Sequence, residues 1–144
     1  MMPPPILLAS ASPRRSELLR QIGIAHEVRP VALDESTHAH EAPAAYVLRL
    51  AEAKARTLWE RLAAHERRPV LAADTTVALE GEIFGKPADA AESRAMLQRL
   101  SGRTHQVHTA VALVHAKGAA ARVSSSDVSL RDLSAAELDW YWNT

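Results

Sequence analysis

The stretch Ile6-Leu7-Leu8-Ala9-Ser10-Ala11-Ser12-Pro13-Arg14-Arg15 decides the fold class. Its first part, Ile6–Ala9, is a short continuous apolar run, which is typical of a strand buried on both faces. Ser12 is a favourable N-cap and Pro13 a favourable first helical residue, so we expect a helix to begin there and to end near Gly23. A buried strand that passes directly into a helix indicates an α/β fold.

Strand and helix patterns alternate along the rest of the sequence. We predict further strands over 25–31, 69–79, 104–114 and 122–130, with a short returning strand at 83–84. We predict further helices over 43–64, over 88–100 and from Ser134, where Ser134 and Glu137 form a capping box. Leu18, Leu19 and Ile22 are the expected apolar face of the first helix. We therefore expect a single α/β domain over residues 1–144, with a mixed central sheet.

The composition argues against several classes of protein. The 17 basic and 17 acidic side chains give a formal net charge of zero, so we expect no non-specific binding to nucleic acid or to a membrane. The sequence has no Cys, which excludes thiolate catalysis and Cys-ligated zinc. No apolar run approaches the roughly 18 residues that a membrane span needs. No basic segment precedes the Ile6–Ala9 run, so the expected location is the cytoplasm.

Ser10, Ser12, Arg14 and Arg15 surround the expected start of the first helix. The N-terminus of a helix presents unpaired N–H groups and the positive end of the helix dipole, which suits an anion. Two hydroxyl and two guanidinium groups add donors for phosphate oxygens. We expect an anion-binding site here. The alternative is a capped surface helix with two solvated arginines.

Lys54 occupies an unusual place on the helix predicted over 43–64. It falls seven residues after Val47, in the middle of an apolar stripe that includes Leu50 and Leu58. Burying a lysine costs free energy unless the ammonium is paired or faces a polar cleft. We expect a cleft. The alternative is a lysine whose ammonium reaches solvent from the edge of the core.

Asp74 interrupts an apolar strand, and a carboxylate at such a point of an α/β sheet lies where ligands collect. The alternative is a hydrogen bond from a turn to the backbone. Lys86 stands between Gly85 and Pro87, which hold it on a tight turn. The adjacent carboxylates Asp34-Glu35 lie in a polar loop, where a solvated surface is the alternative to a functional role.

In this order, these points resemble the Maf family of nucleotide pyrophosphatases. The matching residues are Ser10–Arg15, Asp34-Glu35, Lys54, Ala73–Thr75, Gly85–Pro87 and Ser101–His105. The resemblance begins at Ile6 and covers nearly the whole sequence. It implies the Maf/inosine-triphosphatase-like α/β fold, in which helices flank a mixed central sheet around an active-site cleft.

The resemblance also implies an activity, the hydrolysis of a nucleoside triphosphate between its α and β phosphates. The forms of Ser10–Arg15 and Ala73–Thr75 are similar to those of the branch that acts on dTTP, UTP and modified pyrimidine nucleotides. By the same resemblance Asp74 is the proton acceptor, and Asp74 and Glu35 hold Mg²⁺ or Mn²⁺. The residues that would bind the nucleotide are Ser10, Ser12, Arg14, Arg15, Lys54, Thr75 and Lys86, with Arg14 and Thr75 as specificity positions.

Two alternatives to this activity stay open. The branch that prefers 7-methyl-GTP tends to have Trp at the position of Arg14 and Ser-Asp-Gln in place of Ala73–Thr75. A non-catalytic nucleotide-binding regulator is the second, since the family is associated with septum formation. The family pattern continues past Trp142, so we expect the protein to lack the C-terminal part of the family domain. A homodimer is compatible with the resemblance.

Overall fold

The computed structural model of the protein describes residues 4–142. The strands form one sheet in the order β2-β1-β3-β5-β6, and β4 pairs with β3 outside that order. The strands are β1 (Ile6–Leu8), β2 (His26–Val28), β3 (Val70–Leu79), β4 (Glu82–Phe84), β5 (Thr104–His115) and β6 (Gly118–Ser129). The helices are α1 (Pro13–Gln21), α2 (Pro43–Arg61), α3 (Ala90–Leu100) and α4 (Ala135–Trp142), with a 3₁₀ turn η1 (Ala64–Glu66). The outer limits of the domain expected over residues 1–144 lie outside the described residues.

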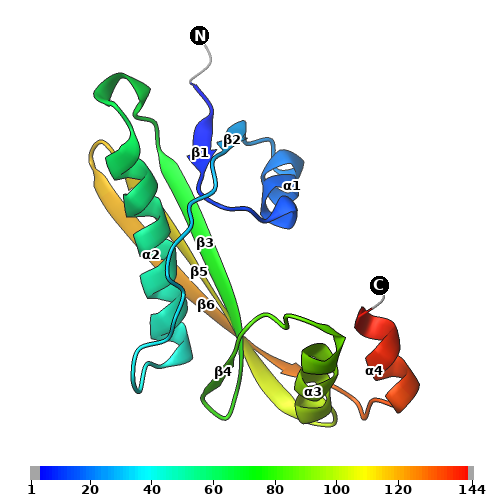
Figure 1. Ribbon diagram of the computed structural model, residues 1–144. Coiled ribbons are helices and arrows are strands. Elements are labelled where there is room, and N and C mark those ends of the chain that lie inside the picture. Colours follow the sequence, from blue (N-terminus) through cyan, green and yellow to red (C-terminus); the bar gives the residue numbers. More distant parts are fainter. Residues whose placement is uncertain (1–3, 143–144) are drawn as a thin grey trace.

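The sheet is mixed, as the sequence predicts. β1 pairs in parallel with β2 and with β3, whereas β3, β4, β5 and β6 pair in antiparallel fashion. Figure 1 shows α2 lying along the long strands β3, β5 and β6, and α1 lying beside β1 and β2. Helices α3 and α4 lie together at the end of the long strands that is farther from α1. Of the helices within residues 4–142, none has both the length and the hydropathy needed to cross a bilayer. The α/β fold is therefore confirmed.

The hydrophobic core lies between α2 and the long strands. Val47 and Ala51 of α2 are fully buried, as are Val70 and Ala72 of β3 and Ala110 of β5. Most of these side chains are small, so the helix can lie close to the sheet. Lys54 lies on this same helix, and its side chain therefore emerges beside β3.

The apolar face predicted for the first helix is wrong in part. Leu19 is buried, but Leu18 is 48% exposed and Ile22 is 69% exposed. The reason is that α1 lies beside two strands of only three residues each, which offer too little surface to cover a broad apolar stripe. The buried polar side chain on α1 is Ser16, whose Oγ lies 2.6 Å from Nε2 of His26.

Two predicted strands have different limits. The strand expected over 25–31 is reduced to β2, and the one expected over 122–130 begins earlier, at Gly118. β5 and β6 form a long hairpin in which His115 pairs with Gly118, so the turn between them fixes where β6 starts. β6 is the last strand of the sheet, and most of its residues are exposed.

β3 has an interrupted edge. β1 pairs with it only at Val70 and Leu71, and β4 only at Val77–Leu79. β5 occupies the opposite edge without interruption, from Val70 to Ala78. Within residues 4–142, no strand pairs with residues 72–76 on the edge shared by β1 and β4, and this break in the sheet positions the site.

Candidate active site

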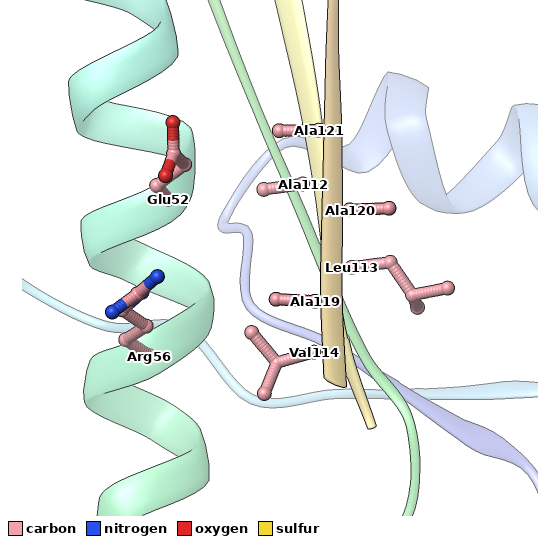
Figure 2. Close-up of a pocket in the computed structure, with 8 residues that line it drawn as sticks. All are labelled: Glu52, Arg56, Ala112, Leu113, Val114, Ala119, Ala120 and Ala121. Carbon is pink, nitrogen blue, oxygen red and sulfur yellow. The ribbon is translucent and has the colours of Figure 1, made fainter. Parts of the chain in front are cut away.

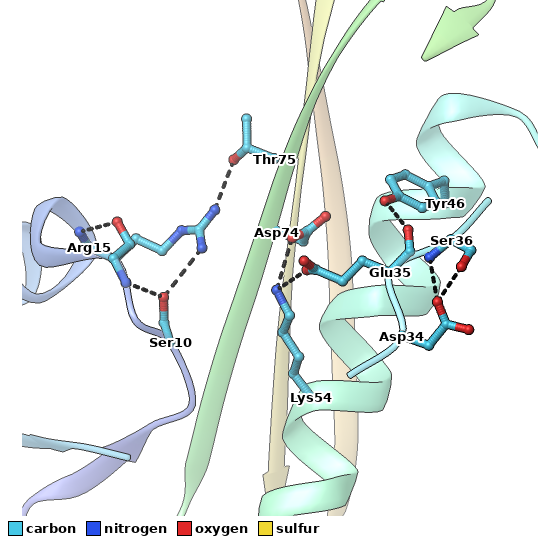
Figure 3. A network of polar contacts seen from close by, with 10 residues as sticks. Ser10, Arg15, Asp34, Glu35, Ser36, Tyr46, Lys54, Asp74 and Thr75 are labelled. Atoms are coloured by element: carbon cyan, nitrogen blue, oxygen red, sulfur yellow. Dashed lines mark hydrogen bonds and ion pairs between the residues drawn. The ribbon is translucent and has the colours of Figure 1, made fainter. Parts of the chain in front are cut away.

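The start of α1 is built from a short series of hydrogen bonds (Figure 3). Ser12 Oγ accepts a hydrogen bond from the backbone N–H of Arg15 at 3.3 Å, as the N-cap prediction requires. Ser10 Oγ accepts from the N–H of Ser12 at 3.2 Å and from Nη1 of Arg15 at 3.3 Å. Arg15 Nη2 then donates to Thr75 Oγ1 at 3.2 Å, which joins the helix N-terminus to β3.

Lys54 lies between two carboxylates. Its Nζ is 3.0 Å from Glu35 Oε1 and 3.0 Å from Asp74 Oδ1. The side chains of Lys54 and Asp74 are only 13% and 12% exposed, whereas that of Glu35 is 53% exposed. Burial by itself lowers the pKa of Lys54, but hydrogen bonds to Glu35 and Asp74 outweigh burial and raise the pKa above its ordinary value. The lysine at the centre of the apolar stripe is therefore charged and paired with two carboxylates, one of the two arrangements that offset the cost of its burial.

The loop that carries Glu35 is fastened to α2. Tyr46 Oη donates a hydrogen bond to the backbone carbonyl of Glu35 at 2.5 Å, and Arg49 Nη2 donates to that of Ser36 at 2.9 Å. Arg49 also forms a bidentate pair with Glu41, and its hydrogen bonds are the main cause that lowers the pKa of Glu41 to about 2. Hydrogen bonds from Ser36 lower the pKa of Asp34, so Asp34 stabilises the turn of the loop.

Tyr46 and Arg49 were missed by sequence reasoning, although a signal for Tyr46 was present. Tyr46 lies eight residues before Lys54, which places both near the same side of α2. Burial is the main cause that raises the pKa of Tyr46, and the charges of Asp74 and Glu35 add to it. No comparable signal identifies Thr109, whose Oγ1 lies 3.0 Å from Thr75 Oγ1 across the sheet.

A cavity of about 380 Å³ adjoins the interrupted edge of β3. This volume lies within the usual range for a small-molecule site. Its walls come from the Glu35 loop, from α2, from β3, from the segment after β4 and from α3. The lining residues are Glu35, Tyr46, Asp74–Val77, Phe84–Pro87 and Met96.

The predicted site residues stand in three relations to this cavity. Glu35, Asp74, Thr75 and Lys86 line it directly. Four predicted residues do not line it: Ser10, Ser12, Arg15 and Lys54. Arg15 contacts Thr75 and Lys54 contacts Asp74, and both of these partners line the cavity. The hydroxyls of Ser10 and Ser12 accept hydrogen bonds from Arg15. Arg14 is exposed on α1 and takes no part in these contacts. Of the quoted motifs, only Ser101–His105 lies elsewhere: Ser101 Oγ accepts from the N–H of Leu133, and His105 is buried.

A second hollow lies between α2 and the β5–β6 hairpin (Figure 2). It measures about 130 Å³, and its walls are rich in alanine, with Glu52 and Arg56 on the helix side. None of the predicted site residues reaches it. The larger cavity is therefore the candidate active site.

Comparison with known protein families matches residues 5–144 to the family described as Maf-like protein. The chain belongs to the Maf family. A relative from Myxococcus xanthus is 51% identical over 139 residues, which cover 96% of this chain and 69% of the relative. Relatives from an Anaeromyxobacter strain and from Bordetella avium are 48% and 49% identical, with 94% and 96% of this chain and 65% and 72% of the relatives covered. All three are named dTTP/UTP pyrophosphatase.

This Maf-family chain spans about two thirds of the length of those relatives. Among solved structures it is similar to the Ham1 protein of Staphylococcus aureus, with a TM-score of 0.55 and 16% sequence identity. That similarity covers 87% of this chain and 70% of the Ham1 chain. It supports the fold that the sequence implied.

Proposed function

We propose that this Maf-family protein is a nucleoside triphosphate pyrophosphatase that converts dTTP and UTP to the monophosphate and pyrophosphate. The observation that carries the proposal is the Asp74–Lys54 pair at the wall of a cavity that Lys86 also lines. The names of the relatives, which are about 50% identical, supply the substrate. The single sheet supports one domain over residues 1–144.

The cationic groups suit a triphosphate. Lys54, Lys86 and Arg15 enter the region of the cavity from α2, from the segment after β4 and from α1. A triphosphate carries several negative charges, and charge moves onto the leaving pyrophosphate as the bond breaks. Fixed cations in a partly water-excluded site stabilise that charge without reorganisation. The hydroxyls of Ser10 and Ser12 and the N-terminus of α1 add neutral donors for phosphate oxygens.

Asp74 is the proposed general base. Its carboxylate is mostly buried and lines the cavity, so it can accept a proton from a water molecule held there. The water oxygen bonds to a phosphorus atom, the bridging P–O bond breaks, and pyrophosphate leaves with the bonding electrons. Lys54 keeps the carboxylate oriented before the nucleotide enters.

Glu35 and Asp74 are the proposed ligands of a divalent cation. One oxygen of each already converges on a single cation, the ammonium of Lys54. Within residues 4–142 no group of three or more His, Cys, Asp or Glu side chains could hold a metal, so phosphate oxygens and water would complete the coordination. Carboxylate and phosphate oxygens are the ligands that Mg²⁺ and Mn²⁺ prefer, and the ion would neutralise part of the triphosphate charge.

The remaining elements of the proposal rest on the resemblance and on composition. Arg14 and Thr75 set the preference for pyrimidine nucleotides. The enzyme acts in the cytoplasm on free nucleotide, with no nucleic-acid or membrane partner, and is compatible with a homodimer. A link to septum formation would follow from its nucleotide binding.

The test is pyrophosphate release from dTTP, UTP and 7-methyl-GTP by the protein, and by a version extended with the C-terminal segment of the Myxococcus xanthus relative. We expect Asp74→Asn to reduce turnover by at least about 10²-fold, the low end of what a general base contributes, while nucleotide still binds. Asp127→Asn is the matched control, since Asp127 lies on β6 and pairs with Gln106 outside the cavity. Hydrolysis by Asp74→Asn at the parent rate would refute the site. Binding without turnover in both parent versions would favour a regulator instead.

A further inference from the structure

The Glu35 loop, residues 29–42, connects β2 to α2 and has no regular secondary structure. A connection of this length loses much conformational entropy when it is ordered, so contacts with the rest of the fold have to fix its shape. Figure 3 shows Glu35 lying against α2, with its carboxylate directed towards Lys54 and Asp74. The position of that carboxylate therefore depends on what fastens the loop to α2.

Arg49 of α2 holds the loop at two points. Its Nη2 donates to the backbone carbonyl of Ser36, the residue next to Glu35, at 2.9 Å. Its Nε and Nη2 also donate to the carboxylate of Glu41, at 2.7 Å and 2.9 Å. Glu41 in turn accepts from the backbone N–H of His38 at 3.0 Å, and its own N–H donates to the carbonyl of His38 at 3.2 Å. One guanidinium therefore closes this part of the loop into a ring against α2.

The same guanidinium also supports Tyr46. It lies 5.6 Å from the centroid of the Tyr46 ring, and Tyr46 Oη donates to the carbonyl of Glu35. The side chain of Arg49 is 29% exposed and that of Glu41 is 9% exposed, so water screens their charge-assisted hydrogen bonds only in part. Arg49 lies outside the lining of the cavity. Any effect of Arg49 on a ligand in the cavity must therefore pass through the Glu35 loop.

We propose that Arg49 is a positioning residue for Glu35 as a ligand of the divalent cation. This inference rests on the proposed function, in which Glu35 and Asp74 share that cation. Only a conformer of the loop that keeps Glu35 beside Asp74 offers both carboxylates, and the apparent affinity for the cation falls in proportion to the population of that conformer. Groups that orient a metal ligand without touching the metal typically contribute about 10–100-fold in affinity or activity. Arg49 acts in this way through the peptide unit that follows Glu35.

The experiment measures by calorimetry how tightly the protein binds a dUTP analogue with a non-hydrolysable α,β-imido bridge, in Mn²⁺ and in EDTA. We expect Arg49→Met to weaken binding about tenfold in Mn²⁺ but less than about threefold in EDTA, because the cationic groups that hold the phosphates are retained. Arg49→Lys keeps the charge opposite Glu41 but not the bidentate fork, so its loss in Mn²⁺ should be intermediate. Arg131→Met is the matched control. It breaks the bidentate pair of Arg131 with Glu137, which lies outside the cavity, and should leave both affinities unchanged.

Glu35→Gln separates positioning from a general structural role. If Arg49 acts through Glu35, adding Arg49→Met to Glu35→Gln should change the affinity in Mn²⁺ less than about twofold. A tenfold effect that persists in this background, or equal losses in Mn²⁺ and in EDTA, would overturn the inference. Parent-like binding by Arg49→Met would overturn it as well.

Pyrophosphate release from dTTP and UTP by the parent protein tests the proposed function separately. If pyrophosphate is released and Arg49→Met binds the analogue like the parent, the inference is wrong while the proposed function stands. If the parent binds the analogue but releases no pyrophosphate, the proposed activity is wrong, and the calorimetry alone decides the inference. If the affinity of the parent does not depend on Mn²⁺, the inference is wrong whether or not pyrophosphate is released.

Discussion

Replacing Lys54 by Met tests whether the charge pair at the centre of the site also stabilises the fold. Met has nearly the length of Lys and an apolar side chain, so packing along α2 is retained. Removing one partner of a fully buried ion pair costs about 3–5 kcal/mol, because the remaining charge is left uncompensated. Asp74 is 12% exposed and borders a cavity, and Glu35 is 53% exposed. Water can therefore solvate the two carboxylates in the variant and offset part of that loss. We expect the free energy of unfolding to fall by about 1–3 kcal/mol.

Urea unfolding of four proteins measures this loss: the parent, Lys54→Met, Asp74→Asn and the double variant. Asp74→Asn should restore part of the stability lost in Lys54→Met, since it removes the uncompensated charge, and the coupling should exceed about 0.5 kcal/mol. The pKa of Lys54 is raised above 10.5, so the ammonium contributes its stabilisation below pH 10.5 and loses it as the pH rises through the folded-state pKa. On the alkaline side, the difference between parent and Lys54→Met should therefore shrink only above pH 10.5. Equal stability of these two proteins at pH 7, or strictly additive losses in the double variant, would refute the pairing argument.

Three further outcomes are expected at other positions. Glu41→Gln should destabilise the protein at pH 7, because the lowered pKa of Glu41 means that its ionised carboxylate stabilises the fold. The difference in stability from the parent should decline as the pH falls from 4.5 towards 2, and a difference that does not vary with pH in urea titrations would contradict this. Ser12→Ala should lower the free energy of unfolding by about 1 kcal/mol through loss of the N-cap, whereas Ser12→Asp should not, and equal thermal midpoints for parent and Ser12→Ala would count against the cap. Arg14→Trp should reduce kcat/KM for UTP relative to 7-methyl-GTP, and an unchanged ratio would remove Arg14 from the specificity residues.

Much of the fold follows from interactions between residues that are close in the sequence. The N-cap at Ser12 and the capping box of Ser134 with Glu137 are formed as predicted. Lys54 could also be singled out in advance, since helical periodicity fixes which residues share a face of α2. The sequence could therefore indicate that the ammonium needs a partner. It could not say which carboxylate would supply one.

Neighbours in space and solvent exposure were decided by the tertiary structure. Leu18 and Ile22 satisfy the helical pattern yet are exposed to solvent. Periodicity shows which residues share one face of a helix, but it does not show how much surface of the neighbouring elements is available to cover that face. Arg15 meets Thr75 across 60 positions of the sequence, a pairing that no short-range pattern encodes.

The sequence by itself determined the alternation of strands and helices and the capped start of α1, because each rests on residue type and short spacing. The order of its motifs indicated the family, and that resemblance proposed the candidate catalytic groups. Only the tertiary structure decided that Glu35 and Asp74 share Lys54, and that β1 and β4 leave a break on β3 beside the cavity. The physical reason is that strand partners and the lengths of their pairing depend on the assembled sheet. A strand such as β3 keeps part of one edge unpaired only when its neighbouring strands end before they reach it.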